Sequence, residues 1–258
     1  MKQKQPLRRI GLARALSKLG YCSRSQATEL IRAGRVWMNG NTRRDPETPV
    51  HLEHDRIVVD GHAIETRAKI YLMMNKPRGL VTTASDEKGR ETVYGLLNKK
   101  GKSLPWVAPV GRLDKASEGL LLLTNDSEWG ARVTAPETHL EKTYHVQIDA
   151  LADEKLVAAL VRGVKGEDGE LRRARRARVL RTGTKNCWLE IVLDEGRNRQ
   201  LRIMLGALGV EVLRLVRVAI GPLQLGELAK GAYRLLSADE KKMLDRFMLD
   251  RAMLVKTP

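Results

Sequence analysis

The chain has 258 residues, 42% hydrophobic and 30% charged, a composition typical of a globular protein with a substantial core. Its 47 Lys and Arg residues outnumber 31 Asp and Glu residues, which gives a formal net charge of +16. A polyanionic partner is therefore the first hypothesis, and a basic surface that serves only solubility is the alternative.

Several classes of protein do not fit the sequence. The longest purely apolar run, Leu120 to Leu123, is too short to span a membrane, and the N-terminal residues lack an apolar signal region. We therefore expect a cytoplasmic protein with no membrane attachment. Cys22 and Cys187 are isolated and the five histidines lack ligand spacing, so we expect no disulfide, no metal and no cofactor.

The N-terminal segment concentrates the positive charge. Residues 1–44 carry eleven basic side chains and one acid. A first helix is expected between residues 12 and 19, and a second begins at Ser23, whose spacing to Gln26 fits a capping box, and ends at Gly34. Asn-Gly at 39–40 and Asp-Gly at 60–61 predict turns after two short strands. These elements predict a small α/β module over residues 1–66, whose basic side chains could contact phosphates.

A larger domain is expected over residues 67–258. Strands are predicted from Tyr71 and over Leu80 to Thr83, and the turn between them, 75–79, is expected to place Lys76 and Arg78 beside each other. Strands outnumber helices, and no βαβ periodicity with a phosphate loop occurs. The sequence therefore predicts an α+β fold on a mixed, mainly antiparallel sheet.

A polar loop bounded by Gly111 and Gly119 holds Asp114 and leads into the four leucines of a buried strand. A loop anchored in this way could hold Asp114 rigidly for catalysis. The alternative is an Asx turn, in which an aspartate binds its own backbone and has no chemical role. The loop alone does not distinguish them.

Three later segments carry further candidates. The alternating strand 142–148 is expected to point Tyr144 inward, either into a site or simply into the core. The run 172–181 holds six arginines and no acid, which fits a solvated edge strand or an RNA contact equally well. Segment 195–202 turns into a helix that places Arg202 beside an apolar stripe, where an arginine usually has a carboxylate partner.

Several blocks of the chain resemble known families. Residues 8–62, with Ser23-Arg24-Ser25-Gln26-Ala27 and Asn39-Gly40, resemble an RNA-binding module first known from a ribosomal protein of the small subunit. Residues 71–245 resemble the rRNA pseudouridine synthases of the branch that carries this module. That resemblance rests on three separated blocks in the family's order: Gly111-Arg112-Leu113-Asp114, Lys142-Thr143-Tyr144-His145-Val146 and Glu195-Gly196-Arg197-Asn198-Arg199-Gln200-Leu201-Arg202.

The resemblance implies an isomerase that converts a uridine of ribosomal RNA to pseudouridine, with the target base flipped into the pocket and no cofactor. It implies that Asp114 is catalytic and paired with Arg202, that Tyr144 lies against the uracil, and that Arg112 helps to bind the substrate. The expected RNA contacts are the following basic residues: Arg9, Lys18, Arg24, Arg32, Arg35, Lys76 and Arg199.

Two other functions remain open at this stage. A non-catalytic RNA-binding factor of ribosome assembly could use the same scaffold, and it would tolerate the loss of the Asp114 carboxylate. A metal-dependent nuclease is less consistent with the sequence, because a buried strand separates Asp114 from Asp126. We expect a monomer whose partner is structured ribosomal RNA.

Overall fold

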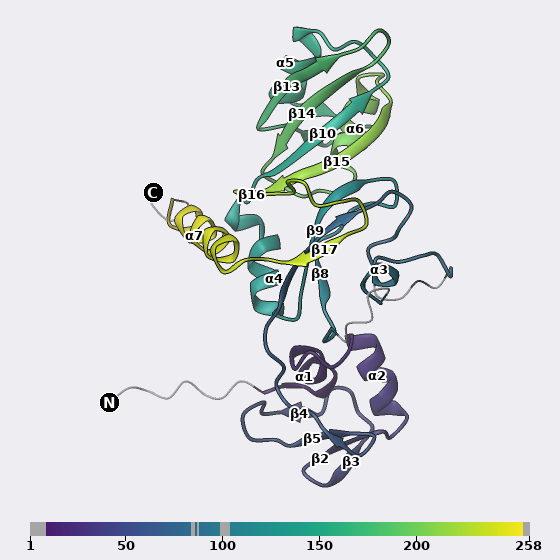
Figure 1. Ribbon diagram of the computed structural model, residues 1–258, viewed down its shortest axis with the longest axis vertical. Coiled ribbons are helices and arrows are strands. Elements are labelled where there is room, and N and C mark those ends of the chain that lie inside the picture. The colour runs from purple at the N-terminus through teal and green to yellow at the C-terminus, as the bar shows by residue number, and fades with distance from the viewer. Residues whose placement is uncertain (1–8, 84–85, 87, 99–103, 255–258) are drawn as a thin grey trace. The chain divides into compact units, whose positions relative to one another are not determined.

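The computed structural model describes residues 9–83, 86, 88–98 and 104–254. The chain divides into two compact units (Figure 1). The first unit comprises residues 1–70 with the segments 102–108 and 124–127, and the second comprises the remainder. Each unit has its own hydrophobic core.

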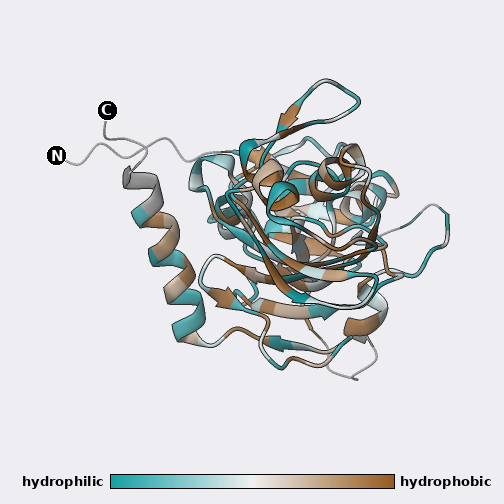
Figure 2. Cartoon of the chain, turned by 90° about the horizontal axis from the view of Figure 1, so that it is seen from above, coloured by the Kyte–Doolittle hydropathy of each residue, from teal (hydrophilic) through white to brown (hydrophobic). Residues whose placement is uncertain are grey.

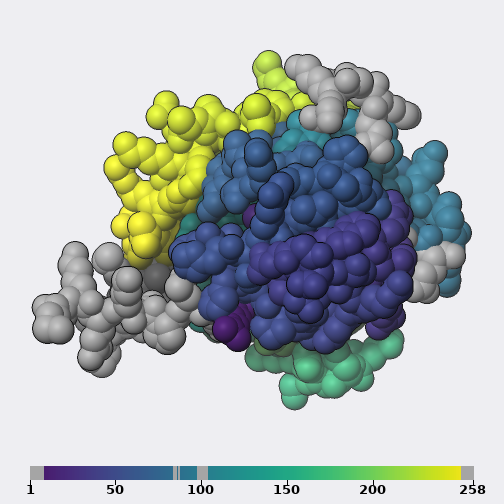
Figure 3. All heavy atoms as spheres, turned by 90° about the horizontal axis from the view of Figure 1, so that it is seen from below, coloured from purple at the N-terminus to yellow at the C-terminus, as the bar shows by residue number. Residues whose placement is uncertain are grey.

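The first unit packs two helices against short antiparallel strands, and Figure 3 draws it in purple and blue. Its sheet has the order β3-β2-β5-β6, and β1 pairs separately with β4. Leu12 and Leu16 of the first helix meet Ile31 of the second in the core. The elements are β1 Ile10–Gly11, α1 Leu12–Lys18, α2 Arg24–Arg32, β2 Val36–Met38, β3 Asn41–Arg43, β4 Pro49–Val50, β5 Ile57–Val59 and β6 His62–Ala63.

The local signals predicted in this unit are present. The Ser23 hydroxyl accepts a hydrogen bond from the Gln26 backbone N–H, and the Gln26 side chain accepts one from the Ser23 N–H, which completes the capping box. Asn39 and Gly40 have φ values of 54° and 82°, and the two positive values fit the tight turn between β2 and β3. Both features depend only on residues close in sequence.

The second unit is built on a mixed sheet. Its main path has the order β13-β14-β10-β15-β9-β7-β17, with β8 and β16 paired beside it. Antiparallel pairs predominate, and β9 pairs with β15 in parallel. The fold is therefore α+β with a mixed, mainly antiparallel sheet, as predicted. The strands are β7 Tyr71–Lys76, β8 Ala108–Val110, β9 Glu118–Thr124, β10 Lys142–Ile148, β11 Val164–Lys165, β12 Leu171–Arg172, β13 Arg176–Thr182, β14 Cys187–Leu193, β15 Val212–Ile220, β16 Leu223–Gln224 and β17 Tyr233–Leu235.

Helices complete two cores in this unit. In one core, Leu160 of α5 and Met204 of α6 pack on β10, β14 and β15. In the other, Trp129 of α4 and Leu244 of α7 pack with the leucines of β9. Hydrophobic and hydrophilic residues alternate along α7 (Figure 2). The helices are α3 Tyr94–Asn98, α4 Ser127–Thr134, the 3-10 helix Pro136–Thr138, α5 Glu154–Arg162, α6 Gln200–Ala207 and α7 Ala238–Leu254. None of the helices in the described ranges is long and apolar enough to cross a bilayer.

Two local predictions are wrong. The segment from Leu80 to Thr83 forms no strand, and its one ladder contact is an isolated bridge between Val81 and Thr92. Lys76 does not stand beside Arg78 at a turn, because it is the last residue of β7 and is fully buried, whereas Arg78 is exposed. Strand β7 extends through Lys76, so Lys76 stays in the buried sheet, and only the residues after it leave the sheet for the exposed turn.

Candidate active site

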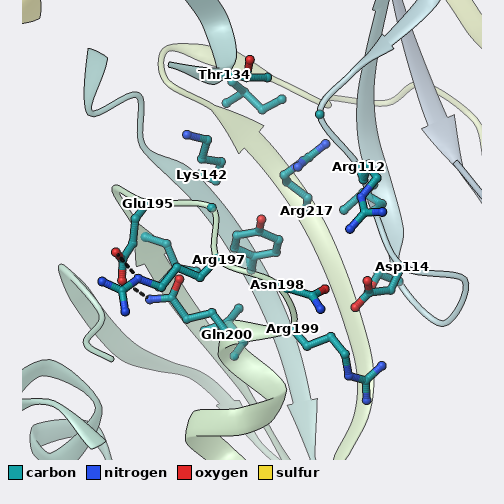
Figure 4. Close-up of a pocket in the computed structure, with 18 of the residues that line it drawn as sticks. Arg112, Asp114, Thr134, Lys142, Glu195, Arg197, Asn198, Arg199, Gln200 and Arg217 are labelled. Atoms are coloured by element: carbon teal, nitrogen blue, oxygen red, sulfur yellow. Dashed lines mark hydrogen bonds and ion pairs between the residues drawn. The ribbon is translucent and has the colours of Figure 1, made fainter. Parts of the chain in front are cut away.

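A pocket of about 650 Å³ lies within the second unit. Its walls come from the loop after β8, the first residues of β10, the loop before α6 and the middle of β15 (Figure 4). The lining brings together residues from all three sequence blocks that were singled out above. The predicted site residues among them are Arg112, Asp114, Tyr144, Arg199 and Arg202.

The Asp114 loop is anchored through its backbone. Ser117 N–H donates to the Asp114 carbonyl over 3.0 Å, and Gly79 N–H donates to the Lys115 carbonyl over 2.8 Å. The Thr82 hydroxyl donates to the Leu113 carbonyl over 2.8 Å. Among the described residues, no hydrogen bond or ion pair occupies the Asp114 carboxylate itself, so the Asx-turn alternative is not what holds this loop. The carboxylate is half-buried and faces the pocket.

Lys76 supports the same loop from inside. Its ammonium donates to the carbonyls of Asp114 and Ser117 over 3.1 and 2.8 Å, and to the Pro77 carbonyl over 3.1 Å. Burial lowers the pKa of Lys76 to about 8, against the opposing charges of Asp114 and Glu118. The expected RNA contact at Lys76 does not fit this position, because its side chain is fully buried and its three ammonium hydrogens already donate to three carbonyls.

Arg202 approaches the loop without the expected ion pair. Its Nη2 donates to the Ala116 carbonyl over 3.4 Å and its Nη1 to the Val212 carbonyl over 3.3 Å. No direct ion pair joins Arg202 and Asp114 in the described part of the chain. Burial and the neighbouring Arg199 lower the pKa of Arg202, whereas the charge of Asp114 acts to raise it. The two side chains are therefore electrostatic neighbours, with carbonyl groups as the direct partners of the guanidinium.

Tyr144 shares its side of the sheet with a buried arginine. The register pairs Tyr144 of β10 with Arg217 of β15, after an irregularity between Thr143 and Tyr144. Cross-strand partners project to the same face, so both side chains line the pocket. Tyr144 is half-buried and packs against the α5–α6 core. Its position therefore fits both interpretations, because the side chain contacts the core and also lines the pocket.

The opposite wall is the loop before α6. The Gln200 side chain donates to Glu195 over 2.7 Å, and Arg197 pairs with Glu195 over 2.9 Å and with Glu170 over 3.1 Å. Arg199 has φ 50°, a left-handed conformation that a residue with a side chain adopts at some cost. The loop is thus fixed by its other side chains, and Arg199 stays exposed at the pocket rim (Figure 4).

The electrostatic balance of the pocket favours an anion. The lining holds six basic and three acidic side chains. Two of the acids are committed elsewhere, since Glu195 pairs with Arg197 and Asp194 lies 3.8 Å from Arg175. Within the described residues, five lining cations form no ion pair, and the same lining holds the carboxylate of Asp114, which is also unpaired. The five cations are Arg112, Lys142, Arg199, Arg202 and Arg217.

The RNA contacts expected in the first unit differ in availability. Arg24 and Arg32 are exposed on α2 and form no ion pair with another described residue. Arg35 is also exposed, but it forms a two-point pair with Asp60 at 2.8 and 2.5 Å. Arg9 donates from Nε to His51 Nε2 over 2.6 Å, and Lys18 is half-buried.

Part of the arginine-rich run is an edge strand: residues 176–182 form β13 at the edge of the sheet, whereas Arg172 belongs to β12 and is buried. Three of its six arginines pair with acids distant in sequence: Arg178 with Glu190 over 2.7 Å, and Arg175 and Arg176 with Glu141 over 2.8 and 2.9 Å. Arg181 instead lies over the Trp188 ring at 4.9 Å. These contacts leave less free positive charge for RNA than the bare sequence indicated.

Sequence reasoning missed two lining residues, Lys142 and Arg217. Lys142 lay inside a recognised block but received no role. Arg217 lay in a predicted strand, and the available signal was two arginines, Arg214 and Arg217, among the apolar residues of that strand. No group of three or more potential metal ligands is found among the residues that the structure describes.

Comparisons with known proteins agree with this geometry. The family model for RNA pseudouridylate synthase matches residues 70–207, and the S4 domain model matches residues 10–62. An uncharacterized RNA pseudouridine synthase of Aquifex aeolicus is 38% identical over 237 residues, covering 91% of this chain and 93% of that protein. The ribosomal large subunit pseudouridine synthase B of Bacillus subtilis is 35% identical over 236 residues, covering 90% and 94%.

A solved structure supports the same family assignment. A crystal structure of a pseudouridylate synthase has a TM-score of 0.62 and 31% identity, and the match covers 91% of this chain and 99% of that one. The chain therefore belongs to the RNA pseudouridylate synthase family and carries an N-terminal S4 domain. It is an RNA pseudouridine synthase, an RNA-binding isomerase that acts on uridine, which decides against the non-catalytic alternative.

Proposed function

We propose that Asp114 is the catalytic group that isomerises a uridine of ribosomal RNA, after the base has left its stack and entered the pocket. The observation that carries this proposal is a pocket lining with one carboxylate and five cations that form no ion pair within the described part of the chain. Such a site attracts a polyanion and presents to it one reactive anionic oxygen pair. The Bacillus subtilis relative is named for the ribosomal large subunit, which supports ribosomal RNA as the substrate.

The reaction requires little beyond this arrangement. The bond between ribose C1′ and uracil N1 breaks, the uracil turns, C1′ bonds to C5, and the proton of C5 leaves while N1 gains one. A carboxylate assists as a nucleophile or by stabilising the charge that develops. Tyr144 is placed to lie against the uracil ring, and removing the base from its stack costs a few kcal/mol, which the cationic walls offset.

The surrounding cations divide into two proposed roles. Arg112 and Arg199 are exposed and fit contacts with the RNA backbone outside the pocket. Arg202, held by the Ala116 carbonyl, fits a role in orienting the loop and in attracting substrate once RNA excludes water. Arg24 and Arg32 on α2 fit phosphate contacts by the first unit. All the lining residues of the pocket come from one chain, which supports a monomer as the active form, and we propose that it acts in the cytoplasm.

The test replaces one carboxylate oxygen of Asp114 by an amide nitrogen. Asp114→Asn is expected to abolish pseudouridine formation in rRNA from cells that lack the protein, while RNA affinity changes by less than about threefold. Asp153→Asn is the matched control, because Asp153 caps α5 outside the pocket and asparagine caps a helix equally well. Sequencing of modified rRNA should show one missing site restored by wild type and by the control only. Restoration by Asp114→Asn would remove the catalytic role.

The same assay addresses the metal-dependent alternative. The proposed chemistry needs no metal, so pseudouridine formation should continue in excess chelator at its usual rate. A loss of activity that added Mg²⁺ restores would contradict this assignment, provided that RNA folding is checked separately.

A further inference from the structure

Arg217 is a buried guanidinium without a full set of partners. It lies in β15, is 5% exposed, and donates from Nε to the Leu120 carbonyl over 2.8 Å. Its Nη2 is buried and has no hydrogen-bond partner among the residues that the structure describes. Arg217 forms no ion pair with any described residue. An unpaired charge removed from water costs several kcal/mol, so a site that keeps one usually receives an opposite charge from outside.

Lys142 is a second cation of the same kind. It begins β10, lines the same pocket, and forms no ion pair with the described residues. Burial and, after it, the charge of Arg217 lower the pKa of Lys142 to about 8, while the charge of Asp194 acts in the opposite direction. The positive charges of Lys142 and Arg217 therefore repel each other in the free protein. Figure 4 draws Arg217 between Lys142 and Arg112 at the wall of the pocket.

The backbone gives Arg217 little freedom to move away. Arg217 is paired with Gly119 in the parallel contact of β15 with β9. A Cβ atom on Gly119 would lie 2.2 Å from the Arg217 carbonyl oxygen, so the two strands approach closely only because this residue is glycine. The position of Arg217 is thus set by the same strand that follows the Asp114 loop.

We propose that Arg217 and Lys142 form an anion-binding subsite that holds a phosphate of the nucleotide whose base enters the pocket. The inference rests on the proposed function, since it assumes that a single nucleotide enters. A phosphate carries a permanent charge, so it compensates two desolvated cations in a way that the neutral oxygens of uracil do not. Exposed rim arginines can bind any RNA, whereas Arg217 is buried and Lys142 half-buried in the pocket wall, so a nucleotide that has left its helix is the ligand expected to reach both.

The experiment compares ligands that differ only in phosphate. Binding of uridine, uridine 5′-monophosphate and uridine 3′-monophosphate to the full chain is measured by NMR titration, which needs no turnover. We expect one monophosphate to bind at least about tenfold more tightly than uridine to the wild type, because an additional buried charge contact contributes well over 1.4 kcal/mol. In Arg217→Met this advantage should fall below about threefold, with uridine affinity unchanged.

The controls separate charge from folding. Arg217→Lys should retain part of the phosphate advantage, and Lys142→Met should lose part of it. Arg178→Met removes an exposed arginine of β13 outside the pocket and should bind all three ligands as wild type does. Unchanged uridine affinity in Arg217→Met shows that the pocket is folded; a fall in uridine affinity equal to that of the monophosphates would mean that Arg217 serves the base or the fold, and would overturn the proposal.

Two further results would exclude the proposed phosphate subsite. If neither monophosphate binds better than uridine, or if the advantage survives in Arg217→Met, no phosphate subsite exists there. Asp114→Asn should keep the phosphate advantage, because the carboxylate is not a phosphate ligand. Should Asp114→Asn remain an active enzyme while the advantage still depends on Arg217, the catalytic assignment fails and the subsite stands.

Discussion

Gly119→Ala should damage both stability and activity. Gly119 is buried in β9 and has φ 102°, and the added Cβ would lie 2.2 Å from the carbonyl oxygen and 2.8 Å from the nitrogen of Arg217. Both neighbours are backbone atoms, so the strand itself must move. Occupying this conformation costs about 1–3 kcal/mol, and each ladder hydrogen bond that is lost costs about 1 kcal/mol more. We therefore expect Gly119→Ala to lower the free energy of unfolding by about 3 kcal/mol or more.

Such a loss is a large part of the stability of an ordinary domain, which is about 5–15 kcal/mol. Urea unfolding followed by circular dichroism measures it, and pseudouridine formation is assayed well below the transition. Activity should fall at least about tenfold in the folded variant, because misplacing catalytic groups by 1 Å has that order of effect. The strand displaced by the Cβ carries Arg217, and β9 follows the Asp114 loop directly.

Gly206→Ala is the matched control. Gly206 lies in α6, and a Cβ atom added there would meet no other atom within 4 Å. The same substitution should therefore raise the free energy of unfolding by up to about 1 kcal/mol. If Gly119→Ala lost less than about 1 kcal/mol and kept wild-type activity, the close approach of β9 and β15 would not have the role assigned to it.

Three further substitutions test the charges around the pocket. Lys76→Met removes the ammonium that holds the Asp114 loop, so single-turnover rates should fall at least about tenfold with RNA affinity unchanged; full activity would refute the positioning role. Glu118→Gln should cost about 2 kcal/mol at pH 7, because ion pairs hold the pKa of Glu118 at about 2. The higher stability of the wild type is present above about pH 5 and disappears as the pH falls towards 2. A stability difference that did not change with pH would contradict the role of the ionised Glu118 carboxylate. The protonated form of Lys142, whose pKa is lowered to about 8, is lost as pH rises, so kcat/KM should decline above pH 8 and the decline should move upward in Lys142→Arg; an unchanged decline would exclude Lys142 as its cause.

Features governed by near neighbours in the chain could be predicted from the sequence. The capping box at Ser23, the Asn39-Gly40 turn and the buried leucine strand after Gly119 all depend on residues a few positions apart. Their energies arise from local backbone geometry and hydrogen bonding, which the sequence states directly. The three blocks that line the pocket were recognised through their resemblance to a known family.

Pairing between distant segments was decided only by the tertiary structure. In β15, arginine occurs on both faces, at Arg214 and Arg217, and apolar residues flank each, so the sequence does not say which one faces the pocket. The register with β10 decides it: Arg217 lies beside Tyr144 in the pocket, and Arg214 pairs with Glu118 over 2.7 Å. Likewise, the carboxylate that Arg202 was expected to find is replaced by carbonyl groups.

The physical reason is the range of the interactions involved. The helix caps, turns and apolar runs of this chain are fixed by contacts within a few residues, so its sequence determined its elements, its α+β class and the residues that could react. Whether a charged side chain is paired, exposed or buried alone depends on which strands lie next to each other and in which register. That choice left Asp114, Arg217 and Lys142 without ion-pair partners among the described residues, and it was made by packing across the whole second unit.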